Sequence, residues 1–519
     1  MMSPPRSMAA LVEQHATERP DALAITFGDR RATFAALETA ANQIANALIE
    51  EGLEPGQRIA VFAKNSDDYL ALVIGAAKAR VCTVALNWRL APAEIAYILQ
   101  DSAARLLFIE PEFVDLHANA IEQCADLKGS VVLDPTRARF EAGTWWSSAS
   151  PTAPDRRASL DDDFVQMYTS GTTGRPKGVV LGHAQYLSAF EQISHFPWAR
   201  YQIDDVVFPP SPFFHVSGLN LAIRALAAGC RLVLRPVFVP TEAPQLIAHE
   251  RVTRTVMVPA VIRQLLAAPE TREHDLSCLR SITYGGSPMP PEVLAEARLI
   301  FGCDFIQGYG LTESGGQATF LHPEDHEESR GKLGSVGRPG PGVEVRIVDP
   351  TGRDLGVGEV GEVLLRSGSQ MTAYWRNPEA TAATIVDGWL YTGDAGYRDA
   401  DGYLYIHDRV KDMIVSGGEN IYPTEVENAL SSHPAVAEVA VIGVPDDRWG
   451  EAVKAIVILH PRVNASSGEL IAHARGQIAG YKLPKSVEFV SSLPRNAAGK
   501  ILRRELRAPY WAGRTKLVG

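Results

Sequence analysis

Strand-like and helix-like stretches alternate through the first two-thirds of the chain, and this alternation constrains the fold more than any other feature. Short apolar runs such as RIAVFA (58–63), RLVLRP (231–236), RTVMVP (254–259) and SITYGG (281–286) have the character of buried strands. Segments with helical periodicity lie between them. Repeated strand–helix units predict α/β layers with largely parallel strands.

One of the helical segments is well delimited. From Thr33 onward, the apolar residues Leu37, Ile44 and Leu48 recur at helical spacing. Gly52 follows as a plausible stop, because glycine readily takes the left-handed conformation that ends many helices. The pattern predicts one amphipathic helix here.

The pattern changes after Gly340. GVEVRIVDPTGRDL, GEVGEVLLRS and GWLYTGDAGYRDADGYLYIHDR read as strands joined by glycine and aspartate turns, which predicts a β-rich section. A smaller mixed α+β unit begins near Lys411. A chain of 519 residues is longer than one hydrophobic core usually supports, so we expect at least two domains. We predict an N-terminal domain (1–408) of layered α/β subdomains with a β-rich subdomain, and a small C-terminal α+β domain (409–519).

Composition narrows the class of protein. A net charge of −11 disfavours a large nucleic-acid surface. The apolar stretch 69–86 is interrupted by Lys78 and Arg80, so it does not read as a membrane span. No apolar core of signal-peptide length stands at the start. Five scattered cysteines without a CxxC argue against a disulfide framework or a zinc site. We therefore expect a cytoplasmic enzyme, although a scaffold protein fits the same composition.

The segment YTSGTTGRPKGVV (168–180) combines hydroxyls, glycines and a lysine. It is not a Walker loop, because Pro176 precedes Lys177 and Gly178 follows it. The GVGEVG at 356–361 leads into a strand, which indicates turn glycines and not a dinucleotide site. Backbone N–H groups near glycines, hydroxyls and one cation together suit an anion. The alternative is a solvated surface turn. The phosphate-binding candidates are Thr169, Ser170, Gly171, Thr172, Thr173, Gly174 and Lys177.

Four further motifs follow this loop in order: GYGLTES (308–314), YTGD (391–394), HDRVKDMIVSGGENIYP (407–423) and LPRNAAGKILRREL (493–506). With YTSGTTGRPKG, they make the chain resemble the adenylate-forming superfamily of acyl-CoA synthetases, luciferases and non-ribosomal adenylation domains. The resemblance extends from about residue 10 to residue 506. It implies that a carboxylic acid attacks ATP to give acyl-AMP and pyrophosphate, and that a thiol then displaces AMP.

The resemblance also implies roles for individual residues. Lys500 would bridge the substrate carboxylate and the α-phosphate, Thr312 would lie near the α-phosphate, and Glu313 would bind Mg²⁺. The adenine and ribose candidates are Gly285, Gly286, Ser287, Tyr309, Asp394 and Arg409. The acyl-pocket candidates are His215, Val216, Ser217, Gly218, Tyr284, Gly310 and Gly315. Lys411 matches the hinge of a mobile C-terminal domain, and the coenzyme A channel candidates are Ser416, Gly417, Gly418 and Glu419.

Each of these residues also has an ordinary structural explanation. Glu313 could be an acid at a helix N-terminus, Asp394 and Arg409 a surface ion pair, and Lys500 a solvated lysine. Tyr309 and His215 could simply pack in the core. The shared order of five motifs favours the functional interpretation.

The acid and the acceptor thiol are less constrained. Relatives that activate amino acids place an aspartate in this region to bind the ammonium group of the substrate. The FFHVSG segment (213–218) has no such carboxylate, so coenzyme A is favoured as the acceptor over a carrier protein. The pocket candidates suit a medium-chain, long-chain or other hydrophobic acid, with an aryl or cinnamate-type acid as the alternative. A catalytically idle nucleotide-binding regulator is the competing hypothesis. Weak peripheral membrane contact through the basic tail and a homodimer both stay open.

Overall fold

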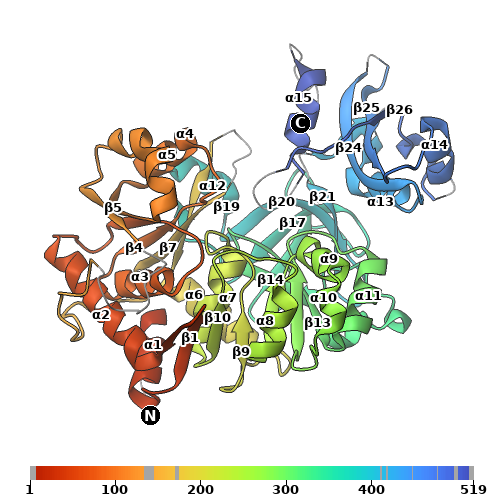
Figure 1. Cartoon of the computed structure of the whole chain (residues 1–519). Coiled ribbons are helices and arrows are strands. Elements are labelled where there is room, and N and C mark those ends of the chain that lie inside the picture. Colours follow the sequence, from red (N-terminus) through yellow and green to blue (C-terminus); the bar gives the residue numbers. More distant parts are fainter. Residues whose placement is uncertain are drawn as a thin grey trace. The chain divides into compact units, whose positions relative to one another are not determined.

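The computed structural model describes residues 7–133, 145–169, 175–409, 412–416, 419–446, 448–475, 477–495 and 501–512. It forms two compact units, Met1–Glu344 with Leu365–Leu390, and Val345–Leu364 with Tyr391–Gly519. The predicted fold class, α/β with a larger N-terminal and a smaller C-terminal part, is confirmed (Figure 1). The domain boundary at residue 408 stays a prediction.

The larger unit contains a nine-stranded sheet. Its strands in spatial order are β15 (Arg338–Pro339), β14 (Gly316–Leu321), β13 (Asp304–Leu311), β12 (Ser281–Gly285), β11 (Arg254–Met257), β9 (Val206–Phe208), β10 (Arg231–Leu234), β1 (Leu23–Phe27) and β2 (Arg30–Thr33). The run from β13 to β1 is parallel, as predicted. Antiparallel strands complete both edges.

A seven-stranded sheet forms the other half of this unit. Its order is β18 (Ala373–Tyr374), β8 (Lys177–Gly182), β7 (Asp163–Thr169), β4 (Cys82–Ala85), β3 (Arg58–Phe62), β5 (Ala104–Ile109) and β6 (Gly129–Val132). The strands from β7 to β6 are parallel, whereas β8 and β18 are antiparallel additions. The phosphate-loop motif thus connects the last parallel strand to an antiparallel one.

Helices lie between and outside these sheets. Those of the larger unit are α1 (Met8–Glu18), α2 (Phe34–Glu50), α3 (Asp67–Lys78), α4 (Pro92–Ser102), α5 (Pro111–Glu122), α6 (His183–Ser194), α7 (Val216–Ala227), α8 (Ala243–Glu250), α9 (Pro259–Ala267), α10 (Glu270–Glu273), α11 (Pro291–Phe301) and α12 (Pro378–Thr384). The predicted helix after Thr33 is α2, with the Thr33 hydroxyl accepting from Ala36 N. Gly52 follows with φ of +73°.

Burial explains the long apolar stretch 69–86, much of which belongs to α3. Every residue of α3 is buried, and α3 contacts β4 of one sheet and β1 of the other. A helix that is buried all round reads as apolar all round. Lys78 is tolerated there because its ammonium pairs with Glu38. None of the described helices is both long and apolar enough to cross a bilayer.

The outer helices enclose separate cores. One core joins β9 to β13 with α8, α9 and α11, and includes Ile247, Ile262, Leu294 and Phe305. Another joins the seven-stranded sheet with α4 and α5. These layers fix the strand ends that carry the motifs.

The predicted β-rich section forms a third sheet. Its order is β16 (Glu344–Val348), β17 (Gly361–Arg366), β20 (Trp389–Arg398) and β19 (Ile385–Val386), with β21 (Leu404–Arg409) paired to β20. The GVGEVG segment leads directly into β17, and Gly358 has φ of +80°. The prediction that these are turn glycines is confirmed.

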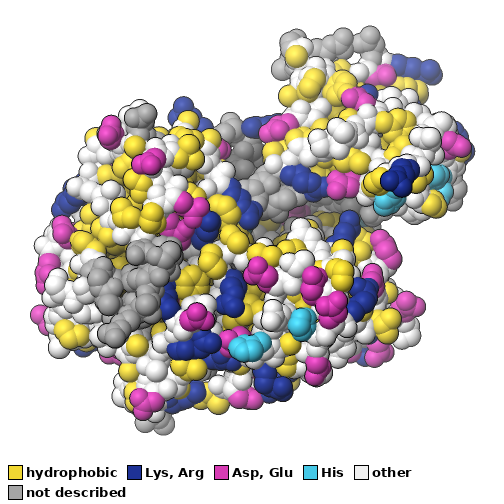
Figure 2. Space-filling view, viewed as in Figure 1, with side chains coloured by type: hydrophobic (Ala, Val, Ile, Leu, Met, Phe, Trp, Pro, Cys, Tyr) yellow, Lys and Arg dark blue, Asp and Glu magenta, His cyan; other side chains and the backbone are white. Residues whose placement is uncertain are grey.

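The C-terminal section forms a fourth sheet with three helices. Its strands are β23 (Glu419–Ile421), β22 (Ile414–Ser416), β25 (Gly450–Leu459), β24 (Val436–Asp446) and β26 (Ser486–Phe489), and its helices are α13 (Pro423–Ser431), α14 (Ser467–Arg475) and α15 (Arg503–Trp511). Its core includes Ile414, Val426, Leu430, Val453 and Leu470. The mixed α+β character predicted for this section is confirmed. On the molecular surface, Lys and Arg side chains are interspersed with Asp and Glu (Figure 2).

Candidate active site

The ends of the phosphate-loop motif are held by an antiparallel strand pair. Thr169 ends β7 and lies opposite Lys177, which begins β8. The Lys177 ammonium lies over the ring of Tyr374, 4.6 Å from its centroid. The predicted residues Ser170, Gly171, Thr172, Thr173 and Gly174 lie outside the described residues. A hydroxyl and a cation therefore flank the predicted anion-binding loop.

Glu313 lies beside this strand pair. Its Oε1 accepts a hydrogen bond from Thr169 Oγ1 at 3.3 Å and one from the Tyr374 hydroxyl at 2.9 Å. Among the residues that the structure describes, Glu313 Oε2 receives no hydrogen bond. The structure thus brings together two residues from separate motifs, and leaves one carboxylate oxygen available to a ligand.

Tyr374 is a site residue that the sequence analysis missed. It reaches Glu313 because β18 pairs with β8, which places Tyr374 opposite Val179. Its motif, MTAYW, contains no glycine pattern or charge that would indicate a site. Only the strand pairing could have identified it.

A tight hairpin between β13 and β14 fixes Glu313 and the adjoining Thr312. Gly315 has φ of +73°, and a Cβ there would collide with Ser369 O. A Cβ at Gly310 would collide with Gly316 O. The buried Ser314 hydroxyl accepts from Leu311 N at 2.8 Å. The positions of Gly310 and Gly315 have no space for a Cβ atom, so both glycines have a structural role whatever else they contact.

The predicted adenine residues converge at the carboxyl ends of β12 and β13. Gly285 is the register partner of Gly308, so Gly285, Gly286 and Ser287 lie beside Tyr309 on the next strand. Gly286 has φ of +81°, and both Gly286 and Ser287 are exposed. Carboxyl ends of parallel strands are the usual position of ligand sites in open α/β sheets.

Tyr284 requires a correction. Its side chain is 1% exposed, packs with Phe305 in the core and bonds His326 Nε2 through its hydroxyl at 3.0 Å. Alternate residues of a strand face opposite sides, so Tyr284 faces away from the side of Thr283 and Gly285. The prediction that Tyr284 lines the acyl pocket is therefore wrong, because its side chain belongs to the core.

His215 immediately precedes α7, followed by Val216, Ser217 and Gly218 in its first turn. Its ring lies 4.6 Å from that of Phe214. Its Nε2 is sealed from solvent and has no hydrogen-bond partner among the described residues. Burial, with a smaller contribution from Arg89, lowers the pKa of His215 to about 4, so the ring is neutral at pH 7. A Cβ at Gly218 would collide with Pro212 O, which packs the helix start closely against its loop.

The ribose candidates lie in the third sheet. Asp394 on β20 is the register partner of Arg409 on β21. Asp394 is 5% exposed. Burial, and then the charge of Asp394, raise the pKa of the neighbouring Glu362. The Arg409 side chain is not described, so the structure places only the two backbones together.

The remaining candidates belong to the C-terminal section. Ser416 and Glu419 are register partners of β22 and β23. The hinge candidate Lys411, the channel candidates Gly417 and Gly418, and the catalytic candidate Lys500 lie outside the described residues. Their roles stay predictions.

The metal-binding capacity of the site is modest. Among the described residues, no group of three or more His, Cys, Asp or Glu side chains is placed to hold a metal. Glu313 offers one hard carboxylate oxygen beside the Thr169 hydroxyl. Mg²⁺ commonly binds to one or two carboxylates together with substrate phosphates, so this donor set fits Mg²⁺ that arrives with a nucleotide.

Comparisons with known proteins show the family of this chain. The sequence matches the family described as AMP-binding enzyme over residues 12–375, and the AMP-binding enzyme C-terminal domain over residues 425–500. It is 40% identical to the fatty acid–[acyl-carrier-protein] ligase ScoC of Streptomyces coeruleorubidus, over 97% of this chain and 96% of that protein. It is 38% identical to a feruloyl-CoA synthase of an Amycolatopsis species, over 95% and 96%. A solved anthranilate CoA ligase, AuaEII in complex with anthranoyl-AMP, covers 98% of each chain with a TM-score of 0.88 and 30% identity.

Proposed function

The chain belongs to the AMP-binding enzyme family and is an acid–thiol ligase, and from this premise we propose that it is an AMP-forming acid–CoA ligase. In the first half-reaction, a carboxylate oxygen attacks the α-phosphorus of ATP and pyrophosphate leaves, which gives acyl-AMP. In the second, the thiolate of coenzyme A attacks the acyl carbon and AMP leaves, which gives the thioester. The observation that carries the proposal is the convergence of Glu313, Thr169 and Lys177.

The phosphate side of the site follows from that convergence. Thr169 and Lys177, with the segment Ser170, Gly171, Thr172, Thr173 and Gly174, bind the β- and γ-phosphates. Glu313 would hold Mg²⁺, and Tyr374 orients the carboxylate through its hydrogen bond. The metal, when bound, neutralises phosphate charge. Preorganised charges of this kind lower the barrier because they are in place before the charge develops.

The nucleoside is bound by two groups of residues. Gly285, Gly286, Ser287 and Tyr309 form the adenine site, and Gly286 and Ser287 are exposed where the chain leaves β12. Asp394 and Arg409 hold the ribose hydroxyls. Thr312 contacts the α-phosphate.

The C-terminal domain (409–519) supplies different groups in the two half-reactions. Lys500 places its positive charge on the carboxylate and α-phosphate during adenylation. Rotation about Lys411 then replaces it with the segment Ser416, Gly417, Gly418 and Glu419, along which the pantetheine arm of coenzyme A passes. The protein acts in the cytoplasm.

The acid binds through its hydrophobic body. His215, Val216, Ser217, Gly218, Gly310, Gly315 and Thr283 form its pocket, and the neutral His215 ring closes the end near the reacting carboxylate. Aliphatic and aryl acids both fit this description, and relatives are named for both.

A carrier protein is the alternative acceptor, because one relative of 40% identity is named as an acyl-carrier-protein ligase. The test is acid-dependent pyrophosphate release over a panel of aliphatic and aryl acids, followed by mass spectrometry of the thioester formed with coenzyme A or with a phosphopantetheinylated carrier protein. A coenzyme A thioester supports the proposal. Pyrophosphate release with transfer only to the carrier protein would replace coenzyme A as acceptor, and no acid-dependent release with any acid would refute adenylation.

A further inference from the structure

The larger unit contains a cavity of about 40 Å³ whose lining includes residues of α7 and of strands β11 to β14. Leu221 and Arg224 line it, one and two turns beyond Ser217 on the same face of α7. Thr283 lines it two residues before Gly285, on the same face of β12. The cavity therefore lies where the far end of a bound acid would point.

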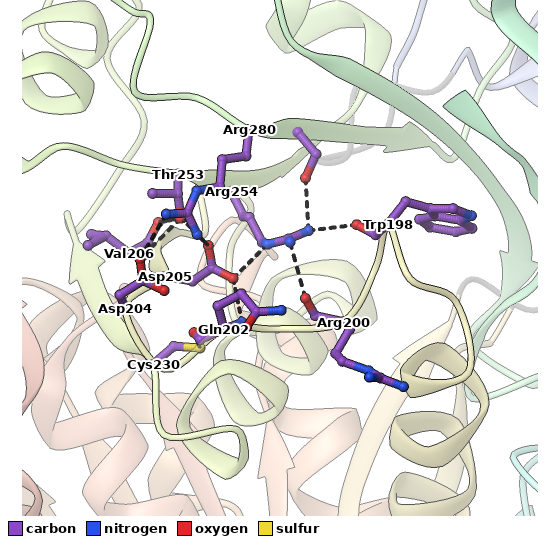
Figure 3. Close-up of polar contacts among 11 residues, drawn as sticks. Trp198, Arg200, Gln202, Asp204, Asp205, Val206, Cys230, Thr253, Arg254 and Arg280 are labelled. Carbon is purple, nitrogen blue, oxygen red and sulfur yellow. Dashed lines mark hydrogen bonds and ion pairs between the residues drawn. The ribbon is translucent and has the colours of Figure 1, made fainter. Parts of the chain in front are cut away.

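Two arginines line this cavity, and one of them is held by the fold. Arg254 donates from Nε to Asp205 Oδ2 at 2.8 Å and from its terminal nitrogens to Trp198 O at 2.9 Å, Arg200 O at 3.1 Å and Ser281 Oγ at 3.2 Å. Figure 3 shows Arg254 pointing into this ring of acceptors. Four of the five N–H donors of Arg254 are therefore used by the fold, which gives this arginine a structural explanation.

Arg224 uses much less of its hydrogen-bonding capacity within the fold. It is 7% exposed, and its one side-chain hydrogen bond among the described residues runs from Nε to Asn220 O at 3.1 Å. Neither terminal nitrogen donates to another described group. The described residues that line the cavity include no acidic side chain, so nothing in the cavity wall balances this charge. An unpaired buried cation is costly and calls for a partner.

Neighbouring polar atoms are also unsatisfied. Asn220 Oδ1 and the Tyr186 hydroxyl are buried without a hydrogen-bond partner among the described residues. Tyr201, Thr283 and Gln317 place further polar groups on the cavity wall. Neither Asn220 nor Tyr186 lines the cavity, so the polar groups that a ligand there would meet are those of Arg224, Tyr201, Thr283 and Gln317. Buried polar groups are normally satisfied, and a buried guanidinium that uses one hydrogen bond among the described residues indicates a site for a polar ligand.

We propose that this cavity receives the far end of the substrate acid, and that this end carries a carboxylate that pairs with Arg224. The inference rests on the proposed function, because it assigns the reacting carboxylate of the same acid to the phosphate side of the site. A guanidinium fork matches a carboxylate in a two-point hydrogen bond. The volume admits a group of a few atoms, on the scale of one to three water molecules. The preferred substrate is accordingly an acid with a second carboxylate, separated from the first by an apolar spacer.

The test compares acids that differ only at the far end. Pyrophosphate release is measured with α,ω-dicarboxylic acids from succinate to suberate and with the monocarboxylic acids of equal length. For the dicarboxylic acid of best-fitting length, we expect kcat/KM to exceed that of its monocarboxylic partner roughly 10- to 100-fold, mainly through KM. Arg224→Met should reverse this preference, and Arg224→Lys should retain part of it because the charge remains.

Arg263→Met is the matched control, since Arg263 is an exposed arginine of α9 in the same unit. It should leave the preference unchanged. Thermal unfolding of Arg224→Met should be unchanged or slightly raised, because an unpaired buried charge is removed. If Arg224→Met does not fold, Arg224→Lys alone decides the question through its partial loss of preference.

The outcomes separate the two proposals. Turnover of monocarboxylic acids that exceeds turnover of every dicarboxylic partner, with no change in Arg224→Met, would overturn this inference and leave the ligase proposal standing. Absence of acid-dependent pyrophosphate release with either series would overturn the ligase proposal itself.

Discussion

Two carboxylates of the larger unit, Asp205 and Glu313, show how a structural charge differs from one kept for a ligand. Asp205 is fully buried and accepts from Gln202 N, Thr253 Oγ1, Arg254 Nε and Arg280 Nη1, at 2.7–3.0 Å (Figure 3). Glu313 is half-buried and accepts two hydrogen bonds from the described residues, both on Oε1. The chain neutralises the first within itself and leaves the second incomplete.

The difference teaches a criterion for recognising sites. A charge whose partners all come from the fold stabilises the fold, because desolvation has been compensated. A charge with unused hydrogen-bonding capacity costs stability, and is retained where a ligand completes it. Arg254 and Arg224 repeat the contrast on the cationic side.

The largest expected effect is a loss of stability when the structural carboxylate, Asp205, loses its charge. Asp205→Asn leaves Arg254 and the partly exposed Arg280 without their shared carboxylate. Removing one partner of a buried ion pair costs about 3–5 kcal/mol, so we expect the midpoint of thermal unfolding to fall by several degrees. Activity per folded molecule at low temperature should persist. Loss of activity without loss of stability would show that Asp205 belongs to the site.

Glu313→Gln addresses the functional half and should show the reverse pattern. The substitution keeps the shape and the hydrogen-bond acceptor but removes the charge that faces the metal. We expect acyl-AMP formation to slow by about 100-fold or more, equivalent to about 3 kcal/mol of activation free energy. Thermal unfolding should change little. A fall in stability as large as that of Asp205→Asn would erase the distinction between the two carboxylates.

A smaller effect tests how far the Glu313 environment is preorganised. Tyr374→Phe removes the 2.9 Å hydrogen bond to Glu313 while keeping the ring beneath Lys177. A hydrogen bond to a charged group contributes about 1.5–3 kcal/mol, so we expect kcat/KM to fall roughly 10-fold and the magnesium concentration needed for half-maximal rate to rise. Unchanged magnesium dependence would remove Tyr374 from the site.

The smallest effect concerns groups that the fold keeps neutral. Burial lowers the pKa of His183 and of His326 to about 4. The ordinary pKa of histidine is about 6.5. As the pH falls from about 6.5 to about 4, these two histidines therefore bind protons in the unfolded chain but stay neutral in the folded chain. The contribution of each neutral histidine to the free energy of unfolding should be complete above about pH 6.5. It should decline as the pH falls from about 6.5 to about 4, with a slope of up to about 1.4 kcal/mol per pH unit for each histidine.

Urea unfolding at about pH 7 and about pH 5.5 measures this loss. His326→Gln should reduce the difference between the two pH values. The exposed His195 is the control, and His195→Gln should leave the difference as it is. An unchanged pH dependence in His326→Gln would show that His326 does not contribute to it.

Much of the fold follows from local sequence. The parallel strands β3, β10, β11 and β12 begin where the apolar runs begin, and α2 starts at its Thr33 cap. These elements are determined by periodicity and capping, which are properties of neighbouring residues. Thr169, Lys177 and Glu313 were likewise singled out from their motifs, although the strand pair and the hairpin that hold them were not predicted.

The parts that could not be predicted depend on contacts between distant segments. Tyr374 meets Glu313 only through the pairing of β18 with β8. The resemblance implied a pocket role for Tyr284, but the two-residue period of a strand places its side chain on the face opposite to that of Thr283 and Gly285. Arg224 was overlooked within an apolar helix. A single charged residue in an otherwise apolar helix was the available signal. The sequence cannot show whether such a residue has an ion-pair partner, because partners come from distant segments.

Adenylation through the Glu313 site is the central claim, and isotope transfer from the acid tests it most directly. The carboxylate of the best substrate is labelled with heavy oxygen, and the products of the complete reaction with ATP, Mg²⁺ and coenzyme A are analysed by mass spectrometry. Attack of the carboxylate on the α-phosphorus predicts AMP that carries one labelled oxygen and pyrophosphate that carries none. Label in inorganic phosphate, with ADP in place of AMP, would contradict the account, because the acid would then have been activated at the γ-phosphate.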